Sequence, residues 1–202
     1  LTIGDLGFLV GPIINSGGRL GFSCYGAELL TSNDTDLLEK KTSELINLNN
    51  KRKKIEKNIL KEINFEKIKK ENKHVIIYYD NKIHEGMIGI IASRLTDYFN
   101  RPSIVLTRSG NLLKASARST KNYNIGKIIK ILVDKDIAEK GGGHNMAAGF
   151  SMKKENLDLL NDFIQEDYLK NNRNFDSIFE YDSEISGSVI NKNLYNEINK
   201  LA

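Results

Sequence analysis

The sequence has few of the residues that build disulfide-bonded, zinc-binding or membrane-spanning proteins. Its 202 residues include one cysteine, two prolines, three histidines and no tryptophan. Because Cys24 has no second cysteine to pair with, a disulfide within the chain is excluded, and we expect a reducing, cytoplasmic setting. The histidines and the cysteine do not occur at metal-ligand spacings, so no zinc site is predicted. No run of about 18 apolar residues is present, so we expect no membrane-spanning helix.

Familiar hydrolase motifs are also missing from the sequence. No segment fits the phosphate-binding loop GxxxxGK[ST], because Gly126-Lys127 has neither the preceding glycine nor the following hydroxyl residue. His84 and Glu85 begin like a zinc peptidase motif, but Ile88 stands where the second histidine would be required. The aspartates form no recognisable carboxylate cluster. The sequence therefore offers candidate anion-binding residues without a complete hydrolytic centre.

The remaining composition is that of a folded, mildly basic protein. An apolar fraction of 40% supports a packed core, and the length allows one full domain with flanking segments or two small domains. The net charge of +4 favours a polyanionic partner, although lysine is abundant along the whole chain and could produce this charge by itself. The basic run Lys51–Lys54 could contact phosphates, but a solvated helix face is the more common origin of such a run.

Residues 1–30 are apolar and rich in glycine, and they begin without a methionine or a basic leader segment. We expect a loop followed by a short helix near Tyr25–Leu30. Because a segment of this size cannot bury its own core, we expect it to be one piece of a longer chain.

Residues 34–72 are predicted to form one long amphipathic helix. The segment contains no glycine or proline and starts with helix N-cap residues. Aliphatic residues recur along it at helical spacings, namely Leu38, Leu45, Leu48, Ile55, Ile59 and Ile63. Asn49 and Arg52 interrupt this apolar stripe, which favours a helix that bridges two domains over a long coiled-coil dimer. The helix could be interrupted near Asn64.

Residues 73–170 alternate between strand and helix patterns, which predicts an α/β fold with a sheet and covering helices. The expected strands are 74–79, 103–107, 112–117 and 146–151, and the expected helices are 88–99, 126–133 and 155–169. Residues 171–202 are expected to contain a polar linker, a strand within 178–190 and a helix from Lys192 to Leu201.

The glycine run Gly141-Gly142-Gly143 before His144 is the most informative segment for function. Consecutive glycines can turn several backbone N–H groups toward one point and so form an anion-binding nest. A histidine beside such a nest can donate a hydrogen bond to a phosphate oxygen or transfer a proton. The alternative is a tight turn between a helix and a strand, with His144 on the surface.

The segment KASARS offers a second group of candidates. On a strand, Lys114, Ser116 and Arg118 share one face. Arg118 could fork onto a phosphate, with Ser116 or Ser119 adding a hydroxyl donor. An ordinary surface strand would explain the same pattern.

Two glycine-containing connections carry the remaining candidates. His84 precedes the predicted helix 88–99, whose open N-terminus favours an anion or simply ends a strand–helix turn. Asn15 and Arg19 lie around Gly17-Gly18, in a shaped loop that could place the arginine at a site.

These four segments, in this order, resemble the RecJ family of single-stranded-DNA-specific exonucleases, within the DHH phosphoesterase superfamily. GPIINSGGRLG is similar to the closing motif of the catalytic DHH domain. HEGMIGIIASRLTDYFNRPSIVL, KASARS and GGGHNMAAGF resemble the DHHA1 domain. GGGH alone would indicate only DHHA1, which also occurs in relatives of alanyl-tRNA synthetase and in small oligonucleotide phosphodiesterases. Ile13, Ile83 and Ala115 depart from the usual Arg, Trp and Gly of the family.

The resemblance implies a fold and a division into parts. It implies a DHHA1-type sheet with covering helices, preceded by a long connector helix. Residues 1–33 would be the end of a DHH catalytic domain, 34–72 the connector, and 73–170 a DHHA1 substrate-binding domain. Residues 171–202 would be a linker and the start of an OB-fold domain.

The resemblance also implies 5′-to-3′ hydrolysis of single-stranded DNA to mononucleotides, in DNA repair and recombination, by a monomer. Two Mn²⁺ or Mg²⁺ ions would activate the water, with ligands upstream of this sequence. The alternatives are a phosphodiesterase for short oligonucleotides or cyclic dinucleotides, and a non-catalytic nucleic-acid-binding module. We take His144 and Arg19 as candidate catalytic residues, and expect substrate contacts from Arg118, Ser116, Ser119, Gly141, Gly142, Gly143, His84 and Asn15.

Overall fold

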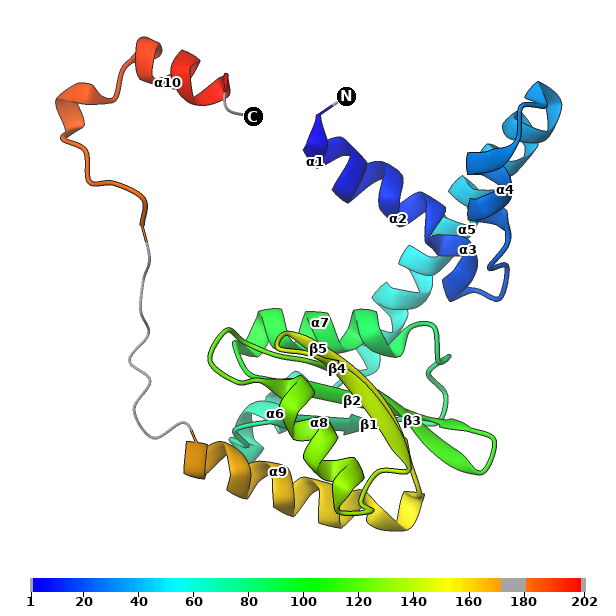
Figure 1. Ribbon diagram of the computed structural model, residues 1–202, viewed down its shortest axis with the longest axis vertical. Coiled ribbons are helices and arrows are strands. Elements are labelled where there is room, and N and C mark those ends of the chain that lie inside the picture. The colour runs from blue at the N-terminus through cyan, green and yellow to red at the C-terminus, as the bar shows by residue number, and fades with distance from the viewer. Residues whose placement is uncertain (1, 172–180, 201–202) are drawn as a thin grey trace.

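The computed structural model describes residues 2–171 and 181–200. Its N-terminal part is helical, and its middle part is a sheet with helices on both faces (Figure 1). The helical elements of the N-terminal part are α1 (Ile3–Asp5), the π-helical turn η1 (Leu6–Val10), α2 (Gly11–Ile14), α3 (Ser16–Arg19) and α4 (Tyr25–Thr31). Elements α2, α3 and α4 pack against the long helix that follows them.

The N-terminal segment differs from its prediction in one respect. The short helix near Tyr25 is confirmed as α4, but the expected loop before it is wrong, because residues 3–19 are mostly helical. Pro12 stands in the first turn of α2, where a proline fits a helix. Gly17 is needed for close packing, since a Cβ on it would lie 2.6 Å from the carbonyl oxygen of Phe22 and 3.3 Å from Leu45. Gly17 therefore serves a tertiary contact.

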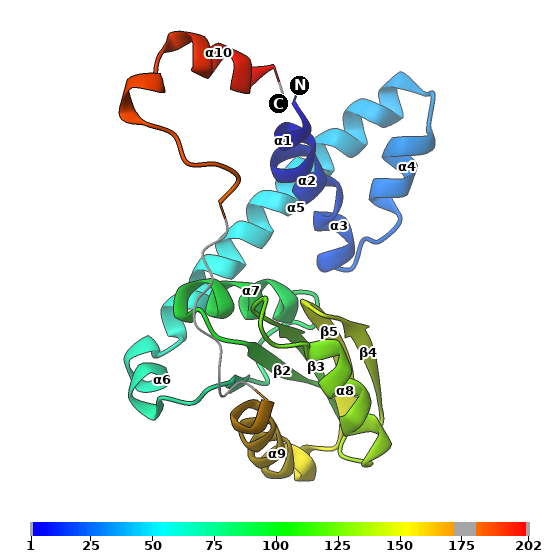
Figure 2. The same ribbon diagram turned by 60° about the vertical axis from the view of Figure 1, so that its left-hand side comes forward.

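The predicted long helix is confirmed as α5 (Thr35–Glu62), with a break before α6 (Phe65–Glu71). Asp34 caps α5 by accepting the backbone N–H groups of residues 36 and 37, at 3.0 and 3.2 Å. Asn64 caps α6, as its side chain accepts the N–H of Lys67 at 2.8 Å. Figure 2 shows that α5 runs from the N-terminal helices to the sheet.

The described residues form one five-stranded sheet, in the order β1-β2-β3-β5-β4. Strands β1 and β2 are parallel, and the other neighbours are antiparallel. The strands are β1 (Ile76–Tyr79), β2 (Ser103–Ser109), β3 (Leu112–Arg118), β4 (Lys140–His144) and β5 (Ala147–Met152). This sheet, with helices on both faces, confirms the predicted α/β fold class.

Helices cover the two faces of the sheet unequally (Figure 1). Helix α7 (Ile88–Phe99) packs on β2 and β3 from one side. Helix α8 (Ile125–Asp134) covers β4 and β5 from the other side. Helix α9 (Leu157–Asn171), which follows the short 3-10 turn η2 (Lys154–Asn156), adds Leu160 and Ile164 to the same core, which also contains Ile104 and Leu106 of β2. Each face has its own apolar core, and Ile63 at the end of α5 joins the core beneath α7.

One predicted strand boundary moves for a physical reason, and one predicted strand does not form in its described part. Strand β1 starts at Ile76 and not at His74, because the side chain of Gln165 on α9 accepts the N–H groups of His74 and Val75 at 3.0 and 3.2 Å. The strand expected within 178–190 is wrong for its described part, where residues 187–189 form the 3-10 turn η3 (Gly187–Val189). Residues 178–180 lie outside the described residues.

The helix expected from Lys192 is confirmed as α10 (Lys192–Asn199). In the ranges that the structure describes, no helix is both long and apolar enough to cross a membrane.

Candidate nucleic-acid interface

Part of the sheet face beneath α7 carries a row of polar side chains, which we call the polar floor. The strand register places Arg118 beside Ala147 and His144, Ser116 beside Gly149 and Gly142, and Lys114 beside Ser151 and Lys140. The alternate residues Ala115, Ala117, Ala148 and Phe150 are buried toward α8 and α9. Because side chains alternate along a strand, the polar set points to the α7 side. We define the floor as Lys114, Ser116, Arg118, Lys140, His144 and Ser151.

The floor is open enough to accept a ligand. A shallow pocket of about 330 Å³ lies over Lys114, Lys140, Gly142, Gly149 and Ser151. Arg118 and His144 lie two strands apart, which corresponds to about 10 Å at the usual strand spacing. One extended, flexible ligand could therefore contact both.

The glycine run is a strand and not a nest, so the predicted bundle of converging N–H groups is wrong. Residues 140–144 form β4, which pairs with β5 along its whole length. A nest needs neighbouring residues whose backbone conformations alternate between right-handed and left-handed. In the described ranges, the glycines with a left-handed, positive φ are Gly21 and Gly110, and neither belongs to the glycine run. Any backbone contact from these glycines to a ligand would have to come from an extended edge strand.

Close packing explains why these positions are glycines. A Cβ on Gly141 would lie 2.6 Å from the Cβ of Phe150, and one on Gly143 would lie 2.5 Å from the Cβ of Ala148. Helix α8 crosses at Gly126, where a Cβ would lie 2.9 Å from the backbone of Gly143. Gly142 points to the open floor, with nothing within 4 Å of such a Cβ. Strands β4 and β5 form a hairpin, and its signal in the sequence is the pair of small-residue runs on either side of Asn145-Met146.

Arg118 is held in place at the edge of the floor. Its Nη1 donates to the Oγ of Ser116 at 3.1 Å and to the carbonyl oxygen of Ala117 at 2.8 Å. The first turn of α7 approaches closely, since a Cβ on Gly89 would lie 3.0 Å from Nη2 of Arg118. Burial, and then the positive charge of Arg19, lower the pKa of Arg118 from its ordinary value. A bound anion would relieve both effects.

Arg19 reaches the same region from the N-terminal helices. Its Nη1 donates to the carbonyl oxygen of Gly86 at 3.4 Å, and Gly86 has no room for a side chain beside the backbone of Arg19. Burial, and then the charge of Arg52, lower the pKa of Arg19, while Glu56 opposes the effect. Asn15, Arg19 and Arg52 line a pocket of about 190 Å³.

The two arginines carry positive charge that the fold does not neutralise. Within residues 2–171 and 181–200, neither Arg19 nor Arg118 forms an ion pair with a carboxylate. Two half-buried guanidinium groups close enough to lower the pKa of one of them favour an anion between them. This arrangement is the clearest sign of a binding site.

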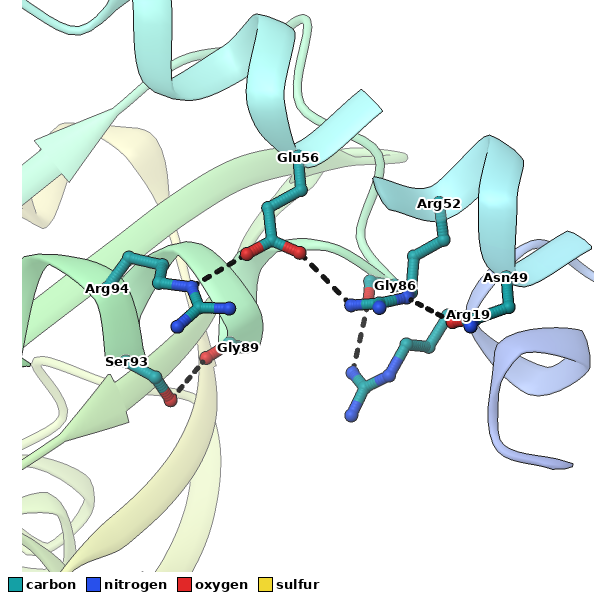
Figure 3. Close-up of polar contacts among 8 residues, drawn as sticks. All are labelled: Arg19, Asn49, Arg52, Glu56, Gly86, Gly89, Ser93 and Arg94. Atoms are coloured by element: carbon teal, nitrogen blue, oxygen red, sulfur yellow. Dashed lines mark hydrogen bonds and ion pairs between the residues drawn. The ribbon is translucent and has the colours of Figure 1, made fainter. Parts of the chain in front are cut away.

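Glu56 ties the long helix to the sheet domain, a link that sequence reasoning missed (Figure 3). Its side chain is only 9% exposed, and its two oxygens accept from Arg52 at 3.0 Å and from Arg94 on α7 at 2.7 Å. Asn49 completes the group by accepting from the Nε of Arg52 at 3.1 Å. The spacing of Arg52 and Glu56 hints at a pair on one helix, but only the tertiary fold brings in Arg94. The link helps to fix Arg19 relative to Arg118.

Of the remaining predicted residues, Ser119 is buried, whereas His84 and His144 are exposed. Ser119 is only 4% exposed and donates to the carbonyl oxygen of Tyr123 at 2.5 Å, so it holds a loop and does not face the floor. His84 is exposed and its Nδ1 accepts the N–H of Gly86 at 3.1 Å, which steadies the connection before α7. His144 is exposed, and its Nδ1 accepts the N–H of Met146 at 3.4 Å. In the neutral ring this leaves Nε2 as a donor.

Comparison with known proteins identifies the class of domain. The family model described as DHHA1 domain matches residues 72–170, the sheet with its helices. The chain therefore carries a DHHA1 domain.

Over most of its length the chain is also homologous to the RecJ exonucleases. The single-stranded-DNA-specific exonuclease RecJ of Haemophilus influenzae is 32% identical over 185 residues, which are 84% of this chain and 32% of that protein. RecJ of Salmonella typhimurium is 34% identical, over 78% of this chain and 29% of that protein. The chain thus spans about a third of the length of these relatives.

Solved structures agree with this assignment. The structure of exonuclease RecJ bound to manganese has a TM-score of 0.64 and 26% identity, over 82% of this chain and 41% of that one. RecJ of Thermus thermophilus in complex with Mn²⁺ has a TM-score of 0.70 at 24% identity, over 82% of this chain and 24% of that one. At this lower identity, the match to the Thermus thermophilus structure supports the fold alone.

The metal ions in those structures have no matching ligand set in the part of this chain that is described. There, no group of three or more His, Cys, Asp or Glu side chains could hold an ion. The polar floor is built of lysine, arginine, serine and histidine, which suit anions and not Mn²⁺ or Mg²⁺.

Proposed function

We propose that this chain is the strand-gripping part of a RecJ-type exonuclease and binds single-stranded DNA across Arg19, Arg118 and the polar floor. The observation that carries the proposal is the pair of half-buried arginines from separate segments, neither of which has a carboxylate partner among the described residues. The RecJ relatives are named for single-stranded DNA, whose phosphates supply the missing negative charge.

Each floor residue has a distinct role in this proposal. The guanidinium of Arg118 binds a phosphate through the N–H groups that Ser116 and Ala117 leave free, and Ser116 keeps its orientation. His144 donates from Nε2 to a second phosphate oxygen or to the leaving group. Because the floor consists of charged, hydroxyl and imidazole groups and carries no exposed Phe, Tyr or Trp ring, we expect contacts mainly to the backbone and little base preference.

The whole protein would cut the strand, and this chain would hold it. We propose that residues 1–33, 34–72, 73–170 and 171–202 are the end of a catalytic domain, a connector, the substrate-binding domain and the start of an OB-fold domain. We further propose 5′-to-3′ release of mononucleotides with Mn²⁺ or Mg²⁺, by a cytoplasmic monomer that acts in DNA repair and recombination. The metal ions would supply the activated water.

The first test measures binding and cutting by the chain itself. We expect the purified chain to bind a single thymidine strand and to leave it intact with Mn²⁺. Binding should weaken as salt rises, with a slope of log affinity against log salt of about −0.7 for each phosphate contacted. Fluorescence anisotropy over a salt series measures the first result, and gel analysis of a labelled strand measures the second. Salt-independent binding, or shortening of the strand, would contradict the proposal.

The second test concerns His144 in the full-length enzyme. We expect His144→Ala to lower turnover on single strands by more than about tenfold, the lower limit for a positioned donor or proton-transfer group. The matched control is His74→Ala, because His74 stacks on Tyr168 at 5.4 Å between ring centroids and is not part of the floor. Steady-state kinetics on both variants decide the matter, and unchanged turnover in His144→Ala would remove this residue from the site.

A further inference from the structure

A basic groove lies between α5 and α7, next to Glu56 but separate from the polar floor. It has a volume of about 550 Å³, and we call it the lysine groove. Its lining consists of Arg52, Lys53, Glu56, Lys57, Leu60, Lys61 and Arg94. Five of these seven side chains are cationic, so the groove is a concentrated positive surface.

The lysines of this groove form one stripe along α5. Lys53, Lys57 and Lys61 follow one another at intervals of four residues, which places them on the same side of the helix. Like charges at this spacing repel, so the helix gains no stability from them. In the described part of the chain, none of the three forms an ion pair.

The one acid in the groove is already neutralised. Both oxygens of Glu56 are taken, by Arg52 at 3.0 Å and by Arg94 at 2.7 Å. Arg94 is 54% exposed and binds Glu56 through Nε, which leaves its terminal amino groups for another partner (Figure 3). Arg94 of α7 and the lysines of α5 thus line the same groove. A solvated face of a single helix would not combine cations from two helices.

The groove adjoins the Arg19 pocket, with which it shares Arg52. Arg52 lines both the lysine groove and the pocket that contains Asn15 and Arg19. From Lys53 to Lys61 the helix rises by about 12 Å, at 1.5 Å per residue. A stacked strand has about three phosphates in that length, at 3.4 Å per nucleotide.

We propose that the lysine groove binds the backbone of the same single-stranded DNA beyond the Arg19–Arg118 pair, as a second stretch of phosphate contacts along the connector helix. This inference rests on the proposed function. It extends the binding site from the few nucleotides at Arg19 and Arg118 to a longer stretch of the strand along α5. A linear array of cations beside the first site fits a chain of phosphates better than one small anion.

The experiment compares strand lengths in the full 202-residue chain. The test variant is Lys53→Gln, Lys57→Gln and Lys61→Gln together, in which exposed lysines are replaced by a good helix former. The matched control is Lys40→Gln, Lys69→Gln and Lys130→Gln, which removes the same charge from exposed sites outside the groove. Thymidine strands of about five and about 20 nucleotides are titrated by anisotropy over a salt series, since such lengths bracket common single-strand site sizes.

We expect the test variant to bind the long strand at least about tenfold more weakly at low salt and to lose about 2 from its salt slope, at about 0.7 for each of three phosphates. The short strand should bind as before, and the control variant should behave like the native chain. An unchanged salt slope with the long strand, or an equal loss of affinity in the control variant, would overturn the proposal that the lysine groove binds DNA. Neither result would affect the proposed function. If the native chain bound neither strand, the proposed function would fail as well. Circular dichroism confirms that each variant is folded.

Discussion

Replacing Arg118 with glutamine is expected to lower the affinity of the chain for a short single strand by about 10- to 100-fold. Hydrogen bonds to a charged group contribute about 1.5–3 kcal/mol each, and 1.4 kcal/mol corresponds to a factor of ten. Arg118 is half-buried and already oriented by Ser116, so little order is lost when a phosphate binds. The measurement is anisotropy with a labelled strand of about five nucleotides.

A second variant at this position separates the effect of charge from that of geometry, and a variant at another position is the control. Arg118→Lys keeps the charge but cannot fork onto a phosphate, so it should restore only part of the affinity. Arg108→Gln is the matched control, because Arg108 is an exposed strand arginine that donates to the carbonyl oxygen of Gly110. Equal affinity of Arg118→Gln and the native chain would show that the strand is held elsewhere.

Gly143→Ala is expected to lower the free energy of unfolding of the DHHA1 domain by about 3 kcal/mol, the upper end of the usual cost of overpacking. The new methyl group would lie 2.5 Å from the Cβ of Ala148 and against the carbonyl oxygen of Ala147, so β4 would have to move away from β5. These atoms of Ala147 and Ala148 belong to the paired strand, and none is the end of a flexible side chain that could give way. Urea unfolding followed by circular dichroism measures the loss.

Gly142→Ala is the control for this prediction, one residue away on the same strand. A Cβ on Gly142 meets nothing within 4 Å, so its stability should stay within about 0.5 kcal/mol of the native chain. Equal stability of the two variants would contradict the close hairpin packing. The comparison also tests the strand against the nest, because a nest of converging N–H groups would have no reason to treat the two positions differently.

Most of the sheet domain was predictable because its patterns are local. Helix α7 was predicted with its observed bounds, since Ile88, Ile91, Ala92 and Leu95 recur at helical spacing and all are buried. Strand β3 alternates between buried and polar side chains, which is typical of a strand with two different faces. Strand β4 was missed because glycine has no side chain to alternate and a low strand propensity.

The candidate site was predictable in part. The shared face of Ser116 and Arg118 follows from the period of a strand, and their hydrogen bond agrees with it. The burial of Ser119 could not be predicted, because it depends on a bond to the carbonyl oxygen of Tyr123 across a turn. The part played by Glu56 needs Arg94, which lies 38 residues away along the chain.

The sequence by itself determined the long helix, the α/β pattern and the DHHA1-like motifs, because periodicity, composition and short motifs are properties of neighbouring residues. The tertiary structure decided that the glycine run is an edge strand, and that Arg19 from the N-terminal helices lies near enough to Arg118 from β3 for its charge to lower the pKa of Arg118. It also brought Arg94 to the lysines of α5. Such contacts depend on how α5 packs against the sheet, and no local pattern encodes that packing.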